Sequence, residues 1–190
     1  LIMDFINSDA ESIASFLSEP VQVEEIYVYM QTNYGTSVTP FYTTLALWVG
    51  GIVLVALMKV KVDYEDDEFK DATEHQKYIG RALLFLAMGQ LQALVVVLGD
   101  LYILKIDCTH PFMLWLAAAI ASFVFTLFIY TLVLTFGDLG KAIAVVMIVL
   151  QIAGSGGTYP IELLPEFFQN VYLYFPFPYA INAMREAISG

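Results

Sequence analysis

Charged side chains are scarce in this sequence, and so are the residues that build metal and redox sites. Of the 190 residues, 14% are charged, whereas a typical soluble domain has about a quarter. The chain has 1 cysteine and 2 histidines, so it cannot close a disulfide within itself, and nothing in it has metal-ligand spacing. The P-loop pattern GxxxxGK[ST] is also absent. We therefore expect no catalytic site, no metal and no cofactor in this chain.

Basic residues are few, and the acidic ones are clustered. The chain has 8 Lys and Arg against 19 Asp and Glu, for a formal net charge of −11. Residues 1–40 contain acids but no Lys or Arg, and a second acidic run lies within residues 61–75. Such runs are typical of solvated segments, and they argue against nucleic acid as a partner.

Apolar residues make up 59% of the chain and gather in four long runs. The runs cover residues 40–60, 82–99, 112–136 and 142–157. A membrane-spanning helix needs about 20 apolar residues, so the first three are long enough and the fourth is a little short. A soluble helical bundle would need polar faces at helical spacing, which the central turns of these runs lack. The sequence predicts an all-α polytopic membrane protein with four spans.

The positions of Lys and Arg predict the orientation of these spans. Residues 59–81 hold 5 of the 8 basic residues, and Lys141 follows the third span. The positive-inside rule then places residues 59–81 and 137–141 in the cytoplasm. Residues 1–40, 100–111 and 158–190 are expected outside.

Few polar groups fall within the predicted spans. Gln90, Gln92 and Gln151 are expected to form hydrogen bonds between helices. Asp100 is expected at a helix end, within reach of water. Ser155 has no histidine placed to act as its base, which argues against hydrolysis.

The two ends of the chain have different characters. Residues 1–39 combine an amphipathic pattern with the strand-like stretch VQVEEIYVYM, and we interpret them as the end of an extracellular domain; a stalk or linker is the alternative. The closing stretch after Gly157 has four prolines and several tyrosines, which favour short pieces at a membrane–water interface. We expect this segment to enter the outer leaflet and a fifth span to follow Gly190. The chain starts without Met or a signal-peptide pattern, so we expect it to be part of a longer protein.

Two blocks resemble a known family. NYGTSVTPFYTTLALWVGG (residues 33–51) and SGGTYPIELLPEFFQNVYLYFPFPYAINAMREAISG (residues 155–190) are similar to the signature blocks of the YhgE/Pip family. That family is named partly for the phage infection protein of Gram-positive bacteria. It belongs to the ABC-2-type exporter membrane domains and is related to the EsaA/YueB-type component of type VII secretion. The resemblance implies an ABC-2-type exporter-like helical bundle in the bacterial plasma membrane, of which this chain holds four of five helices, with a homodimer expected.

The resemblance also implies two functional regions. Residues 62–78 would contact a separate nucleotide-binding subunit, although their strong acidity departs from the pattern of exporters. The candidate residues of this cytoplasmic partner loop are Tyr64, Asp66, Asp67, Glu68, Phe69, Tyr78 and Arg81. Residues 158–185 would form a re-entrant extracellular element. Its candidate residues are Gly156, Gly157, Tyr159, Pro160, Glu162, Leu163, Leu164, Pro165, Phe167, Phe168, Arg185 and Glu186.

Three functions are compatible with these observations. The first is an exporter permease that works with an ATPase subunit and moves an amphiphilic or polymeric substrate. The second is a non-transporting membrane scaffold or receptor, whose extracellular domain would bind a phage tail protein or components of a secretion machine. The third, a membrane enzyme, lacks a placed catalytic base.

Overall fold

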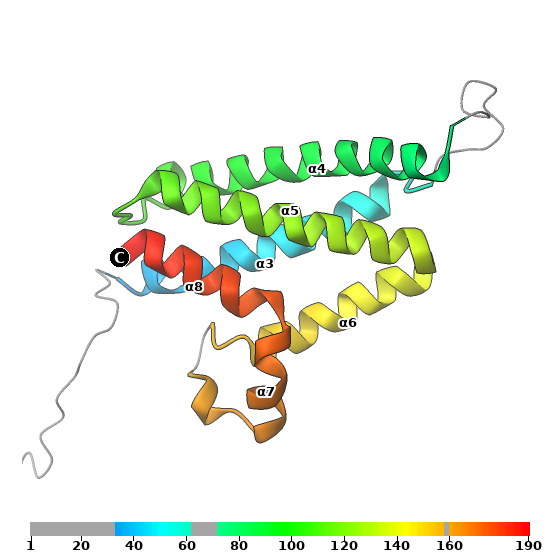
Figure 1. Cartoon of the computed structure of the whole chain (residues 1–190). Helices are drawn as coiled ribbons and strands as arrows, with labels where there is room; N and C mark the ends of the chain where they lie inside the picture. The colour runs from blue at the N-terminus through cyan, green and yellow to red at the C-terminus, as the bar shows by residue number, and fades with distance from the viewer. Residues whose placement is uncertain (1–32, 62–71, 158–159) are drawn as a thin grey trace, which may run out of the picture. The chain divides into compact units, whose positions relative to one another are not determined.

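The computed structural model describes residues 33–61, 72–157 and 160–190. Within these ranges every regular element is a helix, and Figure 1 follows them from blue α3 to red α8. The long helices are α3 (Tyr34–Leu57), α4 (Glu74–Leu98), α5 (Pro111–Phe136), α6 (Asp138–Gly154) and α8 (Pro176–Ser189). The short ones are a π-helix η2 (Gly99–Ile103), two 3-10 helices η3 (Ile161–Leu163) and η4 (Tyr172–Tyr174), and α7 (Glu166–Val171). The helix and strand expected in residues 1–39 fall largely outside the described residues.

Helix α3 begins before its apolar run because a polar residue caps it. The side-chain oxygen of Asn33 accepts a hydrogen bond from the backbone N–H of Thr36 at 2.8 Å. Such a cap satisfies one of the first N–H groups of the helix, which have no partner within it. Pro40 therefore lies inside α3 rather than at its start.

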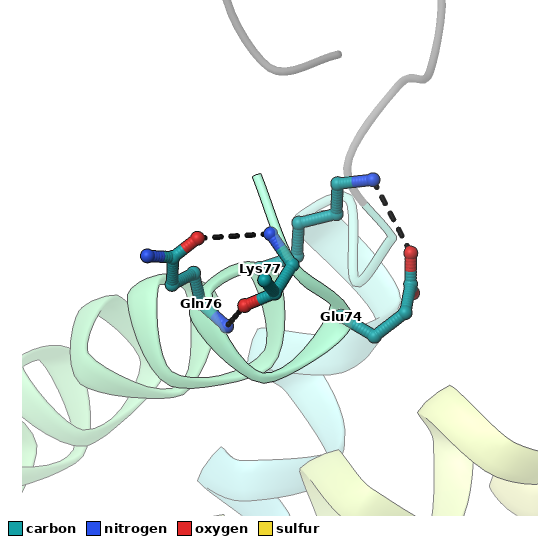
Figure 2. Close-up of polar contacts among 4 residues, drawn as sticks. Glu74, Gln76 and Lys77 are labelled. Carbon is teal, nitrogen blue, oxygen red and sulfur yellow. Dashed lines mark hydrogen bonds and ion pairs between the residues drawn. The ribbon is translucent and has the colours of Figure 1, made fainter. Parts of the chain in front are cut away.

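Helix α4 also begins before its apolar run, at a capping box drawn in Figure 2. The N–H of Thr73 donates to the side-chain oxygen of Gln76 at 2.8 Å, and the N–H of Gln76 donates to the Thr73 hydroxyl at 3.4 Å. Glu74 pairs with Lys77 at 3.3 Å one turn apart and adds a negative charge to the first turn. This reciprocal bonding and the helix dipole both favour a helix start at this point.

Three of the described helices are long and apolar enough to cross a membrane. They are Tyr34–Leu57, Glu74–Ile103 and Pro111–Phe136, and they contain the first three predicted spans almost entirely. The fourth predicted span corresponds to α6, whose 17 residues extend about 25 Å at about 1.5 Å per residue. A bilayer core is about 30 Å thick, so a full crossing by α6 stays a prediction.

Helix α5 lies at the centre of the packing and contacts α3, α4, α6 and α8. Its inner face meets Trp48 of α3, whose side chain is fully buried. The Trp48 ring lies 5.2 Å from that of Phe125 and 5.6 Å from that of Phe177, both edge to face. Its indole N–H donates to the backbone oxygen of Ala144 in α6 at 3.2 Å. One side chain thus joins four helices, and this core positions the elements described next.

Candidate functional site

Helix α8 starts deep in the bundle and ends at its edge. At its N-terminal end, Phe177 is fully buried and stacks on Phe125 at 5.6 Å, beside the middle of α5. At its C-terminal end, the N–H groups of Thr109 and His110 donate to the backbone oxygens of Ile188 and Ala187 at 2.9 and 3.0 Å. In Figure 1 the short helices between α6 and α8 lie beside the bundle, and α8 then runs to the loop that precedes α5. We call residues 155–157 and 160–175 the hairpin.

Arg185 of α8 forms hydrogen bonds to the backbone that follows the end of α6. Its Nη2 donates to the backbone oxygens of Gly157 at 3.0 Å and Gly156 at 3.3 Å. The backbone turns at this point, where Gly156 has a φ of 64°, a value that favours glycine. Gly156 and Gly157 follow the last residue of α6, and a cation is favourable near the C-terminal end of a helix. Arg185 supplies both the donors and the charge to a segment 28 residues away.

Two glycines allow the hairpin and α3 to approach the end of α6 closely. A Cβ atom on Gly154 would lie 2.7 Å from the ring of Phe168. A Cβ atom on Gly157 would overlap the ring of Phe41 in α3. Residues 154–157 thus combine close packing with a break in the helix, since α6 ends at Gly154.

Side chains of the hairpin and of α8 also hold the hairpin in place. Gln169 donates through Nε2 to the backbone oxygens of Leu164 at 2.8 Å and Glu162 at 3.3 Å. The hydroxyl of Tyr179 donates to the backbone oxygen of Leu173 at 2.8 Å. Despite these bonds, the hairpin exposes several large apolar side chains: Leu163, Phe167, Leu173 and Tyr174.

The structure brings together only part of the predicted re-entrant set. Gly156, Gly157 and Arg185 meet, and Phe168 packs on the end of α6. Leu164 is half-buried, and Tyr159 lies outside the described residues. The other members of the set are exposed: Pro160, Glu162, Leu163, Pro165, Phe167 and Glu186.

Of the predicted partner loop, the structure places two residues. Tyr78 shares a hydrogen bond of 2.8 Å with Thr131, and its backbone oxygen accepts from the Tyr130 hydroxyl at 3.2 Å. These bonds fix the first turns of α4 against α5, where a cavity of about 290 Å³ is lined by Lys61 and Lys77 among others. Arg81 is half-buried one turn further along α4. Residues Tyr64, Asp66, Asp67, Glu68 and Phe69 lie outside the described residues.

Two of the three predicted glutamine contacts are confirmed. Gln90 donates to the backbone oxygen of Ala119 in α5 at 3.0 Å, and Gln92 donates to that of Ala46 in α3 at 2.9 Å. Gln151 is fully buried in α6, yet its amide has no hydrogen-bond partner within the described residues.

Asp100 differs from its expected position at a water-exposed helix end. It is 7% exposed because α4 continues beyond Leu98 as the π-helix η2 and keeps the residue inside the bundle. The Thr43 hydroxyl of α3 donates to its Oδ2 at 2.6 Å. The apolar stretch LYIL after Asp100 was the sequence signal that the helix continues.

No group of three or more His, Cys, Asp or Glu residues that could hold a metal ion occurs in the part of the chain that the structure describes. Among the buried polar residues, Thr43 bonds to Asp100 and Ser122 bonds to the backbone oxygen of Gly89, each on another element, whereas Thr39 and Thr44 bond within α3. This arrangement suits a membrane bundle with an irregular closing segment.

Comparison with known proteins gives two matches. Residues 71–190 match the model of a family described as ABC-2 family transporter protein. The chain is also 30% identical over 185 residues to YhgE of Bacillus subtilis (strain 168), a protein described as uncharacterized. That alignment covers 97% of this chain but 23% of the relative, so the chain spans about a quarter of that relative's length. No solved structure matches.

Proposed function

The chain belongs to the ABC-2 family of transporter membrane proteins, and from this premise we propose that it is the permease part of an exporter in the bacterial plasma membrane. It is an all-α polytopic membrane protein, and the match to YhgE confirms the resemblance to the YhgE/Pip family. The observation that carries the proposal is the family match over residues 71–190, which includes every helix from α4 to α8.

In this proposal, the end of the bundle that holds the lysines faces the cytoplasm. Lys59 and Lys61 at the end of α3 line one cavity of about 310 Å³ with Asp138 and Lys141 at the start of α6. Two segments that the positive-inside rule assigns to the cytoplasm therefore lie at the same end of the bundle. The hairpin and the start of α3 then face outward, and residues 1–39 are extracellular.

Labelling of single cysteines tests this orientation. In intact cells, a membrane-impermeant maleimide should label Glu166→Cys and leave Glu68→Cys unlabelled until the membrane is opened. Both variants carry Cys108→Ala to remove the native thiol. Labelling of Glu68→Cys from outside intact cells would show that the orientation is inverted.

Export needs a source of energy that these residues do not supply, because the sequence contains no P-loop. We assign ATP hydrolysis to a separate subunit that docks at the cytoplasmic start of α4, beside Tyr78 and Arg81. The bonds of Tyr78 to α5 would pass a displacement of this end to the centre of the bundle.

Co-purification tests the proposed ATPase. The full-length protein, purified from its native membrane with a mild detergent, should carry an ATPase subunit. Replacement of residues 62–71 by a Gly/Ser segment of equal length, or Arg81→Glu, should remove that subunit. Tyr102→Ser, which changes a residue 73% exposed in η2, beyond the other end of α4, is the matched control and should retain it. If no ATPase accompanies the unaltered protein, the exporter proposal fails.

A second function, a membrane scaffold or receptor, is favoured by one fact. The match covers only 23% of the relative, so most of that protein lies outside the part similar to this chain. In this case an extracellular domain does the work, as a phage receptor or as part of a secretion machine. Phage adsorption that survives replacement of residues 62–71, but is lost with the extracellular domain, would select this function over export.

We also propose a homodimer, since ABC-2 permeases need a second membrane subunit to enclose a path. The mass of the full-length protein in detergent, measured by light scattering, should correspond to two chains. A single chain at every protein concentration would contradict the dimer.

A further inference from the structure

A cavity of about 390 Å³ lies between the first half of α3 and the end of α4 with η2. Such a volume falls within the range of small-molecule sites, about 300–1,000 Å³. Its wall is largely apolar, and Asp100 is the one acidic residue among the described residues that line it. The lining residues are Gly35, Val38, Thr39, Tyr42, Thr43, Ala46, Val96, Asp100 and Leu104.

The carboxylate of Asp100 reaches this cavity without a cationic partner. Thr43 donates to Oδ2 at 2.6 Å, and no ion pair of Asp100 is present in the described residues. Lys105, the nearest basic residue along the chain, is exposed. Ionisable groups within membrane helices are costly and usually mark a site of function. Buried charges in proteins are usually paired with a group of opposite charge.

The backbone around Asp100 forms a π-turn. The N–H of Leu104 donates to the oxygen of Gly99 at 2.9 Å, five residues back, which widens the helix into a π-turn. The N–H of Gly99 is shared between the oxygens of Val95 and Val96. The π-turn lies at the C-terminal end of α4, where such turns are common. Here the turn holds Asp100 towards α3, at the wall of the cavity.

We propose that this cavity binds a cationic amphiphile, with an ammonium head against Asp100 and an apolar body along Val38, Ala46 and Val96. The charge of the wall is complementary to a cation, and its apolar area to an alkyl or aromatic body. Tyr42, which is 57% exposed, also lines the cavity and adds an aromatic side chain to its wall. Residues 1–40 contain no Lys or Arg, so none of their side chains supplies this cation. The binding does not depend on whether the chain exports.

Photo-crosslinking of the full-length protein tests this site. The probe is a long-chain alkylamine with a diazirine in its chain, added to protein in phosphatidylcholine nanodiscs, with the alkanol and alkanoate of equal length as comparisons. Mass spectrometry should find the amine on residues 35–46 and 96–104, about tenfold or more above the alkanoate. Tenfold corresponds to about 1.4 kcal/mol of binding free energy, within reach of one charge-assisted hydrogen bond.

Matched variants separate the charge from the cavity. Asp100→Asn keeps an acceptor for Thr43 and should lower labelling by the amine about tenfold, while labelling by the alkanol stays unchanged. Ala46→Phe fills the cavity and should lower labelling by both probes. Asp138→Asn changes an exposed acid at the other end of the bundle and should have no effect. Thr43→Val removes the hydrogen bond but keeps the carboxylate, so labelling by the amine should persist. This variant provides a second test if Asp100→Asn fails to fold.

Three outcomes would overturn the proposal. The first is equal labelling by amine and alkanol, which would leave the carboxylate without a role. The second is labelling spread over all apolar faces, which would indicate partition into lipid only. The third is a crosslink between two chains at this cavity in the absence of probe, which would make a second copy the occupant.

Discussion

Replacement of Arg185 by alanine tests the hydrogen bonds that join α8 to the backbone after α6. The guanidinium donates to two backbone oxygens, at 3.0 and 3.3 Å, and the longer of these bonds is the weaker. A hydrogen bond to a charged group contributes about 1.5–3 kcal/mol to stability. Arg185 is half-buried, so values near the lower limit apply. For one good and one weak bond, we expect Arg185→Ala to lower the free energy of unfolding by about 2 kcal/mol.

The matched control is Lys141→Ala, which removes a cation and a 3.0 Å ion pair to Asp138. The Asp138 side chain is 96% exposed, and exposed pairs contribute about 1 kcal/mol at most. Arg185→Lys should fall between the two, because an ammonium keeps the charge but lacks the planar fork that reaches both oxygens.

The assay is unfolding of the full-length protein by sodium dodecyl sulfate in mixed micelles, followed by tryptophan fluorescence. Limited proteolysis in the native micelle should also cut the hairpin of Arg185→Ala faster, because its anchor to α8 is lost. The reasoning is refuted if Arg185→Ala and Lys141→Ala shift the unfolding midpoint equally, or if Arg185→Ala leaves proteolysis unchanged.

Two further predictions follow from local packing. Gly157→Ala should lower stability in the same assay by about 1–3 kcal/mol, because its Cβ meets the ring of Phe41; Gly80→Ala, where a Cβ meets nothing within 4 Å, should be neutral or stabilising. Burial raises the pKa of the Cys108 thiol, and the backbone N–H of His110 opposes this in part. Alkylation of native Cys108 by iodoacetamide should therefore reach half its maximal rate at a higher pH than alkylation of the denatured protein, and equal profiles would contradict this.

The bodies of the long helices could be predicted from sequence because each is an unbroken apolar run. Their starts could not be predicted from hydropathy, since the residues that begin α3 and α4 are polar. Asn33 and Thr73 are both recognisable N-caps. Capping residues therefore predict where α3 and α4 begin, whereas the apolar runs do not.

The contacts that shape the site depend on residues distant in sequence. Prolines predicted a broken segment after Gly157, but Arg185 reaches that segment from 28 residues further on. Asp100 resembled a helix end because a lone acid after an apolar run is a common stop. Its burial depends on Thr43, 57 residues away in α3, and on a π-turn that no periodicity marks. Such pairings are set by tertiary packing rather than by local pattern.

The unequal burial of the three long helices indicates where other molecules contact the bundle. In the most apolar 18-residue stretch of each long helix, the buried share is 28% for α4 with η2, compared with 44% for α3 and for α5. The side chains that α4 exposes along this stretch are nearly all apolar, among them Leu83, Leu91 and Val95. Water is an unfavourable solvent for such a face, so lipid or another protein must cover it. The same helix carries Tyr78 and Arg81 at one end and leads into Asp100 at the other. A contact along α4 would therefore act on both proposed sites. The other long helices are held more closely, because Trp48 of α3 packs against α5, α6 and α8.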